Sequence, residues 1–330
     1  MKRLPGGDGM YFPYMRGKQY ELITVRETAS EMAAAGFVPI IAPVREQLRG
    51  LHKALEAICE AGGQAVLITN PEHGQLTHDG SSISEMLDDE FEGRDNLLVG
   101  IRLHSGVTSS EAIFMCESAK DRPIALIHAG FKEANAFADQ LGTIDRVRAH
   151  IFMEDDCGKL YQKRFKADKI KQVLIRDGFE KRRNRDHPAS EFFSELHITY
   201  DLEGMNGFGD FLIVGDEYSE SGGPAYTIAI HLTYIDHEQD GAMYVRHFLS
   251  DRQDTPKDPG GKFAEALEKL TKFLDSPDGR KVYRTSAVAE FRDLAERAHY
   301  PGLGYLKKLS MKHHIETLAQ YFKNNSPDGA

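Results

Sequence analysis

Short apolar runs alternate with longer amphipathic or polar stretches through the first half of this chain, and this pattern most restricts its fold. Each run has the length of a buried strand and is followed by a segment long enough for a helix. Such alternation indicates parallel strands joined by crossover helices, with the sheet covered on both faces. Six strands are predicted in this way, at residues 37–42, 64–69, 97–103, 123–128, 147–153 and 172–176.

Two further apolar runs, at 211–214 and 225–235, bring the predicted count to eight. Eight strands favour an α/β fold of the (β/α)8 or TIM-barrel type, irregular at its last units and followed by C-terminal helices. An open, doubly wound sheet is the alternative. Neither GxGxxG nor GxxxxGK[ST] follows any of the strands, so a nucleotide-binding Rossmann or P-loop fold lacks its sequence fingerprint.

A single domain is expected over residues 11–325. Its core would cover 37–235, and a hairpin and helices would fill 236–325, with 1–10 as a flexible leader and 326–330 as a disordered tail. No apolar run approaches the roughly 20 residues of a membrane span. The three cysteines are far apart in sequence, which fits a reducing cytoplasm.

Polar residues follow most of the predicted strands, at the rim where a barrel carries its active site. Arginines there could hold phosphate, histidines could transfer protons, and acids could orient them or hold a divalent metal. No specific metal ligand or cofactor is predicted, because strand ends also meet ordinary polar loops, and a rim that only binds a ligand is a further alternative. The candidate catalytic residues are Arg102, His104, His128, Asp155, Arg176, Asp216 and Glu217.

A basic stretch interrupts an otherwise acidic chain, whose net charge is −10. Between Lys159 and Arg185 there are eleven Lys or Arg against three acids, which leaves a local charge of +8. Such a stretch can bind phosphate, nucleic acid or an acidic partner, or can simply be solvated. Aromatic residues within it are few, so base stacking has little support. The candidate binding residues are Lys181, Arg182, Arg183 and Arg185.

The adjacent His313 and His314 lie in a predicted helix. Neighbouring helical positions point about 100° apart, so the two cannot share one metal ion, and a structural use is expected.

Several short motifs resemble a poorly characterised bacterial family related to the "beta proteins" of phages and mobile elements. They are a Y-x-P-x-x-R-x-K-x-x-E opening at Tyr11–Glu21, a Gly-Asp-aromatic motif at Gly209–Phe211, and the His313-His314 pair. Many members have Tyr where this chain has Phe211. The resemblance implies a barrel-type fold and an accessory role near phage-defence or mobile-element genes, sometimes beside a nuclease-like protein.

Two functional hypotheses follow. In the first, the protein is an accessory or binding component of a phage-defence or mobile-element system that contacts a partner protein or nucleic acid through the basic stretch. In the second, it is a hydrolase or phosphodiesterase-like barrel whose rim residues converge on one pocket. With a strand at 211–214, Gly209 and Asp210 would lie at the rim opposite Asp216 and Glu217. We therefore expect Asp216 and Glu217 to carry chemistry and Asp210 to serve the structure.

Overall fold

The computed structural model describes residues 10–220 and 223–325, so the expected leader, apart from Met10, and the expected tail lie outside the described residues. The chain, which the sequence suggested is a single domain, divides into two compact units. The barrel unit comprises residues 1–176 and 199–210, and the C-terminal unit comprises residues 177–198 and 211–330. Within the described residues, no helix combines the length and the apolar character needed to span a bilayer.

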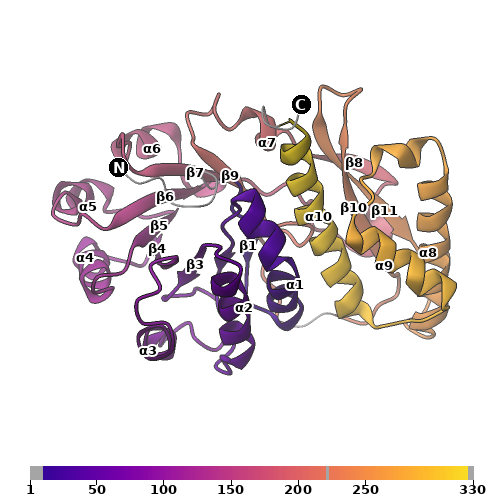
Figure 1. The fold of residues 1–330 in the computed structure, drawn as a ribbon, viewed down its shortest axis with the longest axis horizontal. Helices are drawn as coiled ribbons and strands as arrows, with labels where there is room; N and C mark the ends of the chain where they lie inside the picture. Colours follow the sequence, from indigo (N-terminus) through magenta and orange to yellow (C-terminus); the bar gives the residue numbers. More distant parts are fainter. Residues whose placement is uncertain (1–9, 221–222, 326–330) are drawn as a thin grey trace. The chain divides into compact units, whose positions relative to one another are not determined.

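The barrel unit contains a sheet of eight parallel strands in which each strand pairs with the next (Figure 1). The first strand also meets the last: a parallel bridge joins Tyr11 to Phe208, whose amide donates to the Met10 carbonyl at 2.8 Å. The predicted TIM-type barrel is thereby confirmed. The strands are β1 (Tyr14–Met15), β2 (Ile40–Ile41), β3 (Ala65–Ile68), β4 (Leu97–His104), β5 (Ile124–Ala129), β6 (Val147–Met153), β7 (Lys171–Ile175) and β9 (Gly207–Gly209).

Helices connect the strands and cover the sheet, as the alternation in the sequence predicts (Figure 1). In α4, for example, the Thr108 hydroxyl accepts from the Glu111 amide while the Glu111 carboxylate accepts from the Thr108 amide, a capping box that fixes the start of the helix. The helices are α1 (Gln19–Ala35), α2 (Arg49–Glu60), α3 (Ser81–Glu90), α4 (Ser109–Ser118), α5 (Ala134–Leu141) and α6 (Lys159–Arg164). The short α7 (Leu196–Thr199) belongs to the C-terminal unit except for its last residue.

The sequence predicted the inner six strands but misplaced the other two. The barrel begins with β1 and ends with β9, whereas residues 211–214 form a turn in the C-terminal unit. Strands of two and three residues leave almost no periodic pattern, so their pairing depends on barrel closure rather than on local sequence. As a result Asp210 directly follows the last strand, which corrects the expectation that it precedes a strand.

Residues from two of the three motifs, Tyr11 and Asp210, meet where the barrel closes. The buried Tyr11 hydroxyl donates to the Asp210 carboxylate at 2.7 Å. A Cβ at Gly209 would lie 2.1 Å from the carbonyl oxygen of Phe12, so only glycine allows the first and last strands to approach this closely. These motif residues therefore serve barrel closure.

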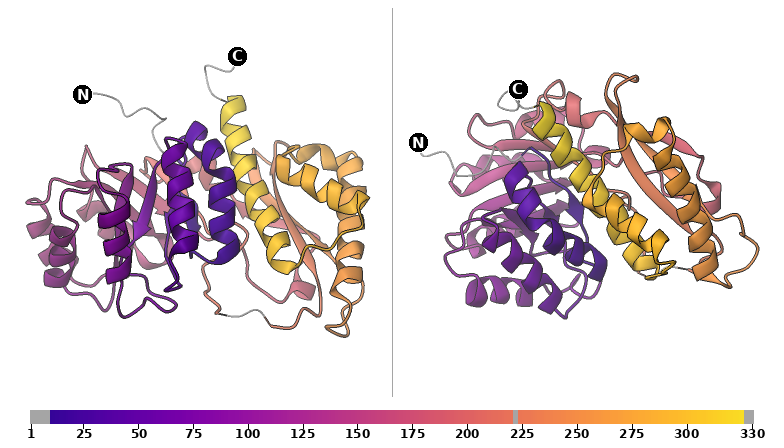
Figure 2. Two further views of the ribbon diagram at one scale, coloured as in Figure 1. Left: turned by 60° about the horizontal axis from the view of Figure 1, so that its bottom comes forward. Right: turned by 45° about the vertical axis from the view of Figure 1, so that its right-hand side comes forward.

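The C-terminal unit is built on a three-stranded antiparallel sheet in the order β10-β11-β8. The strands β10 (Ala229–Asp236) and β11 (Ala242–Leu249) pair along their whole length, and β8 (Ser190–Ser194) pairs with β11. The run 225–235, expected as the eighth barrel strand, therefore contributes to a hairpin of the C-terminal unit instead. The helices are α8 (Pro259–Asp275), α9 (Ser286–Glu296) and α10 (Leu303–Asn325). Figure 2 shows them packed against this sheet.

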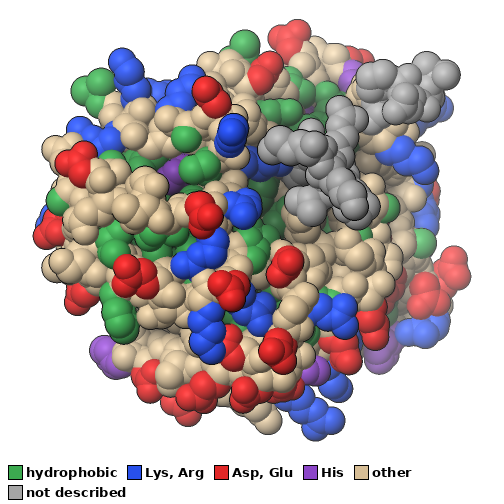
Figure 3. All heavy atoms as spheres, turned by 60° about the vertical axis from the view of Figure 1, so that its left-hand side comes forward, with side chains coloured by type: hydrophobic (Ala, Val, Ile, Leu, Met, Phe, Trp, Pro, Cys, Tyr) green, Lys and Arg blue, Asp and Glu red, His purple; other side chains and the backbone are tan. Residues whose placement is uncertain are grey.

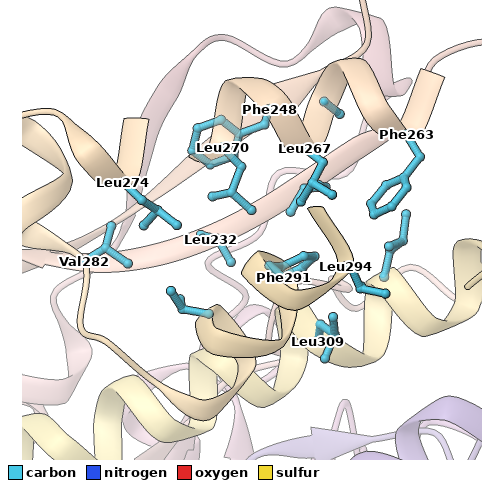
Figure 4. Close-up of a cluster of buried hydrophobic side chains, with 14 of the residues drawn as sticks. Leu232, Phe248, Phe263, Leu267, Leu270, Leu274, Val282, Phe291, Leu294 and Leu309 are labelled. Atoms are coloured by element: carbon cyan, nitrogen blue, oxygen red, sulfur yellow. The ribbon is translucent and has the colours of Figure 1, made fainter. Parts of the chain in front are cut away.

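One face of this sheet supplies the hydrophobic core of the C-terminal unit (Figure 4). Alternate residues of β10, such as Ile230 and Leu232, point toward Phe263, Leu267 and Leu270 of α8 and toward the residues of α9. The intervening residues of β10, including His231 and Thr233, therefore lie on the opposite face. The side chain of His231 therefore lies outside this core.

Candidate functional site

Arg102 on β4 is anchored near the mouth of the barrel. Its backbone exchanges two hydrogen bonds with the side chain of Asn70, at 2.8 and 2.9 Å, and its guanidinium pairs with Glu72. Its Nε is buried and has no hydrogen-bond partner among the described residues. His104, at the end of the same strand, accepts the Gly106 amide at 3.1 Å and so stabilises the turn.

His128 does not line the mouth of the barrel. Its ring is completely buried and packs against Phe165 and Tyr161 of the outer helical layer, so it points away from the barrel axis. One ring nitrogen bonds the Tyr161 hydroxyl at 2.7 Å and the other bonds His150 at 2.9 Å. Burial, followed by the proximity of His150, holds the pKa of His128 well below its usual value. A neutral ring with both nitrogens engaged is suited to packing rather than proton transfer.

The remaining barrel candidates, Arg176 and Asp155, are respectively bound by an acid and exposed. Arg176 grips the Glu154 carboxylate with two hydrogen bonds of 2.6 and 2.7 Å and contacts Glu203 at 3.4 Å. The bond to Glu154 raises the pKa of Arg176. Asp155 lies exposed on the short 3-10 helix Glu154–Asp156. Of the five predicted catalytic residues of the barrel unit, His128 thus faces the outer helices, His104 holds a turn and Arg176 is bound by Glu154.

Asp216 and Glu217 belong to the C-terminal unit and do not follow a barrel strand. Both are exposed. The Asp216 amide donates to Asp177 at 2.7 Å, and Lys181 donates to the Glu217 carbonyl at 2.7 Å. Their placement corrects the expectation of a seventh-strand acid pair at the barrel rim, because the run 211–214 is a turn.

A basic cavity of about 640 Å³ opens within the C-terminal unit. All four predicted basic residues line it, together with a lysine from α10. No Asp or Glu occurs among its described lining residues. Apolar side chains complete the wall, including Phe179, Tyr226 and Leu306. The cationic residues are Lys181, Arg182, Arg183, Arg185 and Lys307.

Acidic neighbours contact several of these cations from outside the lining. Arg183 bonds Asp186 at 2.6 Å, Lys181 lies 3.4 Å from Glu217, and Arg182 lies 2.9 Å from Glu191. Only one or two of the five N–H donors of an arginine are used in such a pair. The cavity wall therefore keeps donors for an anion.

One residue of the cavity lining also carries a buried polar atom without a partner among the described residues. Thr227 lines the cavity, is 3 % exposed, and its hydroxyl oxygen has no hydrogen-bond partner in the part of the chain that the structure describes. The Thr227 backbone is fixed, because its carbonyl accepts from Asn184 at 2.8 Å. Buried hydroxyls are normally satisfied, so an unsatisfied one beside a cavity points to a ligand or water.

Three histidines gather beside this cavity, and two of them, His187 and His231, line it. One potential ligand atom from each of His187, His231 and His247 lies within 4.8 Å of the others. His231 and His247 are direct cross-strand partners in the hairpin, with their Nδ1 atoms 2.6 Å apart. The rings of His187 and His247 stack with centroids 4.3 Å apart.

Glu191 on β8 connects the histidine cluster to the basic wall. Its carboxylate accepts from His247 Nε2 at 2.9 Å and lies 3.4 Å from His187 Nδ1, while Arg182 approaches its other oxygen. Burial lowers the pKa of His247 to about 4 and that of His231 well below its usual value. The imidazoles are thus neutral near pH 7, the form that binds transition metals.

The sequence did not indicate this cluster, because its members are spaced 44 and 16 residues apart and match no metal-binding motif. One signal was present: the pairing of Asp236 with Ala242 sets a register in which His231 falls opposite His247. A hairpin predicted with this register would have placed His231 opposite His247, which are two of the three residues.

His313 and His314 are both fully buried in α10. His313 bonds Thr285 and the Thr233 carbonyl, each at 2.8 Å, and His314 contacts the Thr233 hydroxyl at 3.1 Å. The pair therefore attaches the last helix to β10, as the expected structural use requires.

No protein-family model matches the chain, and a search among curated proteins finds no match either. The resemblance to the phage and mobile-element family therefore stays a prediction from the motifs.

Proposed function

We propose that the C-terminal unit binds a small phosphate-bearing ligand of nucleotide size in the basic cavity. The observation that carries this proposal is the composition of the wall: five Lys or Arg and no acid among the described lining residues, beside an apolar surface. A volume of about 640 Å³ lies within the range of sites for small organic molecules.

The ion pairs around the cavity are compatible with phosphate binding. Exposed salt bridges contribute only about 0–1 kcal/mol, so a doubly charged phosphate can compete for the same guanidinium groups. Arginine also binds phosphate through two parallel N–H donors, which a single carboxylate partner does not exhaust. Arg183, whose side chain is 71 % exposed, is the most accessible of these groups.

The apolar part of the wall favours an organic body attached to the phosphate. Tyr226 is 47 % exposed although its backbone is fixed, since the buried Lys262 donates to its carbonyl at 2.5 Å. A rigidly mounted, accessible aromatic ring is suited to stacking on a nucleobase.

Isothermal titration of the full chain with adenosine 5′-monophosphate and, separately, with inorganic phosphate tests this function. We expect saturable binding of the nucleotide that weakens as salt is raised. Arg183→Glu with Arg185→Glu should lower the affinity for both probes at least tenfold, because both are pocket-lining cations. Tyr226→Ala should weaken the nucleotide alone, since inorganic phosphate has no base to stack.

A matched control comes from the same basic stretch of sequence. Lys163 and Lys166 are exposed but belong to the barrel unit and do not line the cavity. Lys163→Glu with Lys166→Glu makes the same change in net charge and should leave binding intact. If both double variants lost affinity equally, the loss would be due to net charge and not to the cavity. If the protein bound an oligonucleotide but not the mononucleotide, the proposed small ligand would be wrong and the cavity would bind nucleic acid.

The accessory role in a phage-defence or mobile-element system, with a nuclease-like partner, stays a prediction that rests on the motif resemblance. A ligand-binding C-terminal unit is compatible with it. The alternative of a hydrolase or phosphodiesterase-like site at the barrel rim has less support, because His128 faces the outer helices and Arg176 is paired with Glu154.

A further inference from the structure

We propose that His187, His231 and His247 bind a divalent transition-metal ion of the zinc class, with one coordination position open to the basic cavity. The proposal goes beyond ligand binding by the cavity and depends on a different group of side chains. It rests on their placement by three separate elements, on the carboxylate behind them, and on their access to the cavity.

The backbone fixes the three imidazoles independently of one another. His231 and His247 occupy opposite positions on β10 and β11, and they share the sheet face that the hydrophobic core leaves free. His187 comes from the segment that follows the short 3-10 helix Asn184–Asp186 and leads into β8. Two of the three imidazoles are thus mounted on a sheet, which positions ligands more precisely than a loop does.

Glu191 has the position of a carboxylate that orients metal-binding histidines. By accepting from His247 Nε2 and facing His187 Nδ1, it favours the proton on those nitrogens. The lone pairs then lie on the opposite ring nitrogens, which is the usual arrangement behind a histidine-bound zinc ion. Its second oxygen is held by Arg182 at 2.9 Å, so the carboxylate is itself fixed.

The contact between His231 and His247 is the point where the ion would enter. Their Nδ1 atoms lie 2.6 Å apart, a spacing that two neutral rings tolerate only with a proton between them. Ligand nitrogens around a tetrahedral zinc ion stand roughly 3.3 Å apart, given Zn–N bonds of about 2.0–2.1 Å. A small outward rotation of either ring therefore converts this contact into a coordination site.

The donor set selects the class of metal. Three imidazole nitrogens suit zinc and its first-row neighbours, whereas calcium and magnesium prefer oxygen ligands. Three protein ligands leave a fourth position for water or a substrate oxygen, as in catalytic zinc sites. Because His187 and His231 line the cavity, that position faces the same space as the basic residues.

Titration of the metal-free full chain with zinc chloride, and with cobalt chloride followed by visible absorption, tests the site. We expect one ion per chain and the absorption bands of tetrahedral Co²⁺ with nitrogen ligands. His231→Ala should abolish both signals, and it suits the test because His231 is only half-buried. Glu191→Gln should retain the site with affinity lowered about 10- to 100-fold, the usual effect of losing an orienting carboxylate.

The matched control is His237→Ala, an exposed histidine in the turn of the same hairpin. It should bind one ion with unchanged affinity and unchanged cobalt bands. Absence of one-to-one binding, or binding that survives His231→Ala in a chain shown by circular dichroism to be folded, would overturn the proposal. Because these titrations contain no phosphate or nucleotide, their failure leaves the function of the basic cavity unaffected, and the reverse also holds.

Discussion

The barrel unit and the C-terminal unit each bury a group of histidines, and the surroundings of the two groups differ. In the barrel, His128 bonds both His150 and Tyr161, and the two imidazoles are packed among phenylalanine rings. In the C-terminal unit, His187 and His231 border a cavity, with Glu191 behind the cluster. His128 and His150 within the barrel strands thus complete the packing, whereas His187 and His231 stand at a concave surface.

The same contrast applies to the charged residues. Arg176 in the barrel unit donates to Glu154 from its Nε and its Nη2, and basic and acidic side chains are intermixed on the face shown in Figure 3. The cations of the cavity wall have their acidic neighbours outside the lining. The presence of an arginine or lysine therefore does not indicate function by itself. Its position in the fold determines whether it forms an internal ion pair or is available to bind a ligand.

The largest effect expected concerns barrel closure. Gly209→Ala would bring a Cβ to 2.1 Å from the Phe12 carbonyl and 2.4 Å from an Ile175 methyl, so the first and last strands must separate. We expect the free energy of unfolding to fall by about 3 kcal/mol or more. Chemical denaturation followed by circular dichroism measures the loss, and hydrogen exchange should locate it in the barrel unit.

The control for this substitution is Gly142→Ala. Gly142 ends α5 with an ordinary negative φ, and an added Cβ there meets nothing within 4 Å. The free energy of unfolding of the Gly142→Ala variant should change by less than about 0.5 kcal/mol. Equal losses for the two variants would show that closure at Gly209 is not the cause.

The second effect is a loss of stability in acid that is caused by the buried His150 of the barrel. Burial lowers the pKa of His150 to about 4, while in the unfolded chain it returns to near 6.5. Between these values only the unfolded state takes up the proton, so stability is full above pH 6.5 and falls as the pH is lowered toward 4. The contribution of His150 is about 2 kcal/mol lost between pH 7 and pH 5.

His150→Asn isolates this contribution, because asparagine keeps a hydrogen-bonding atom toward His128 without titrating. The difference in unfolding free energy between wild type and variant should shrink by about 2 kcal/mol from pH 7 to pH 5. A difference that stays constant over this range would mean that His150 is not held neutral by its burial.

How far the sequence predicts this molecule depends on the range of the interactions involved. The inner strands were predictable because full burial makes each a continuous apolar run, as at Ala65–Ile68. Tyr14–Met15 and Gly207–Gly209 were not, because two or three residues become strands only when the barrel closes. The position of Asp210 was misjudged for the same reason.

The candidate site was predictable in part, for a related reason. Lys181 to Arg185 are close in sequence, so their positive charge was visible directly, although the rest of the basic stretch belongs to the barrel unit. His187, His231 and His247 come together only through strand register and a loop. Sites assembled by tertiary structure leave no local pattern to read.

A third and smaller effect tests the motif contact at the closure. Tyr11→Phe removes the hydroxyl that donates to the Asp210 carboxylate at 2.7 Å. Hydrogen bonds to a buried charged group contribute more than neutral ones, so we expect a loss of about 1.5 kcal/mol in unfolding free energy. Tyr20→Phe, at a half-buried position of the same unit, is the control and should be nearly neutral. If Tyr11→Phe left the free energy of unfolding unchanged, the motif would have no structural explanation from this contact.

The smallest effect compares one arginine from each unit. Arg176→Gln removes a partly exposed ion pair with Glu154 and should lower stability by about 1 kcal/mol at most, without changing nucleotide or phosphate affinity. Arg183→Gln should leave stability within about 0.5 kcal/mol, because its side chain is 71 % exposed, yet weaken phosphate binding severalfold. Denaturation and calorimetric titration of both variants give the two values side by side. If Arg176→Gln weakened binding as much as Arg183→Gln, the assignment of packing to one unit and binding to the other would fail.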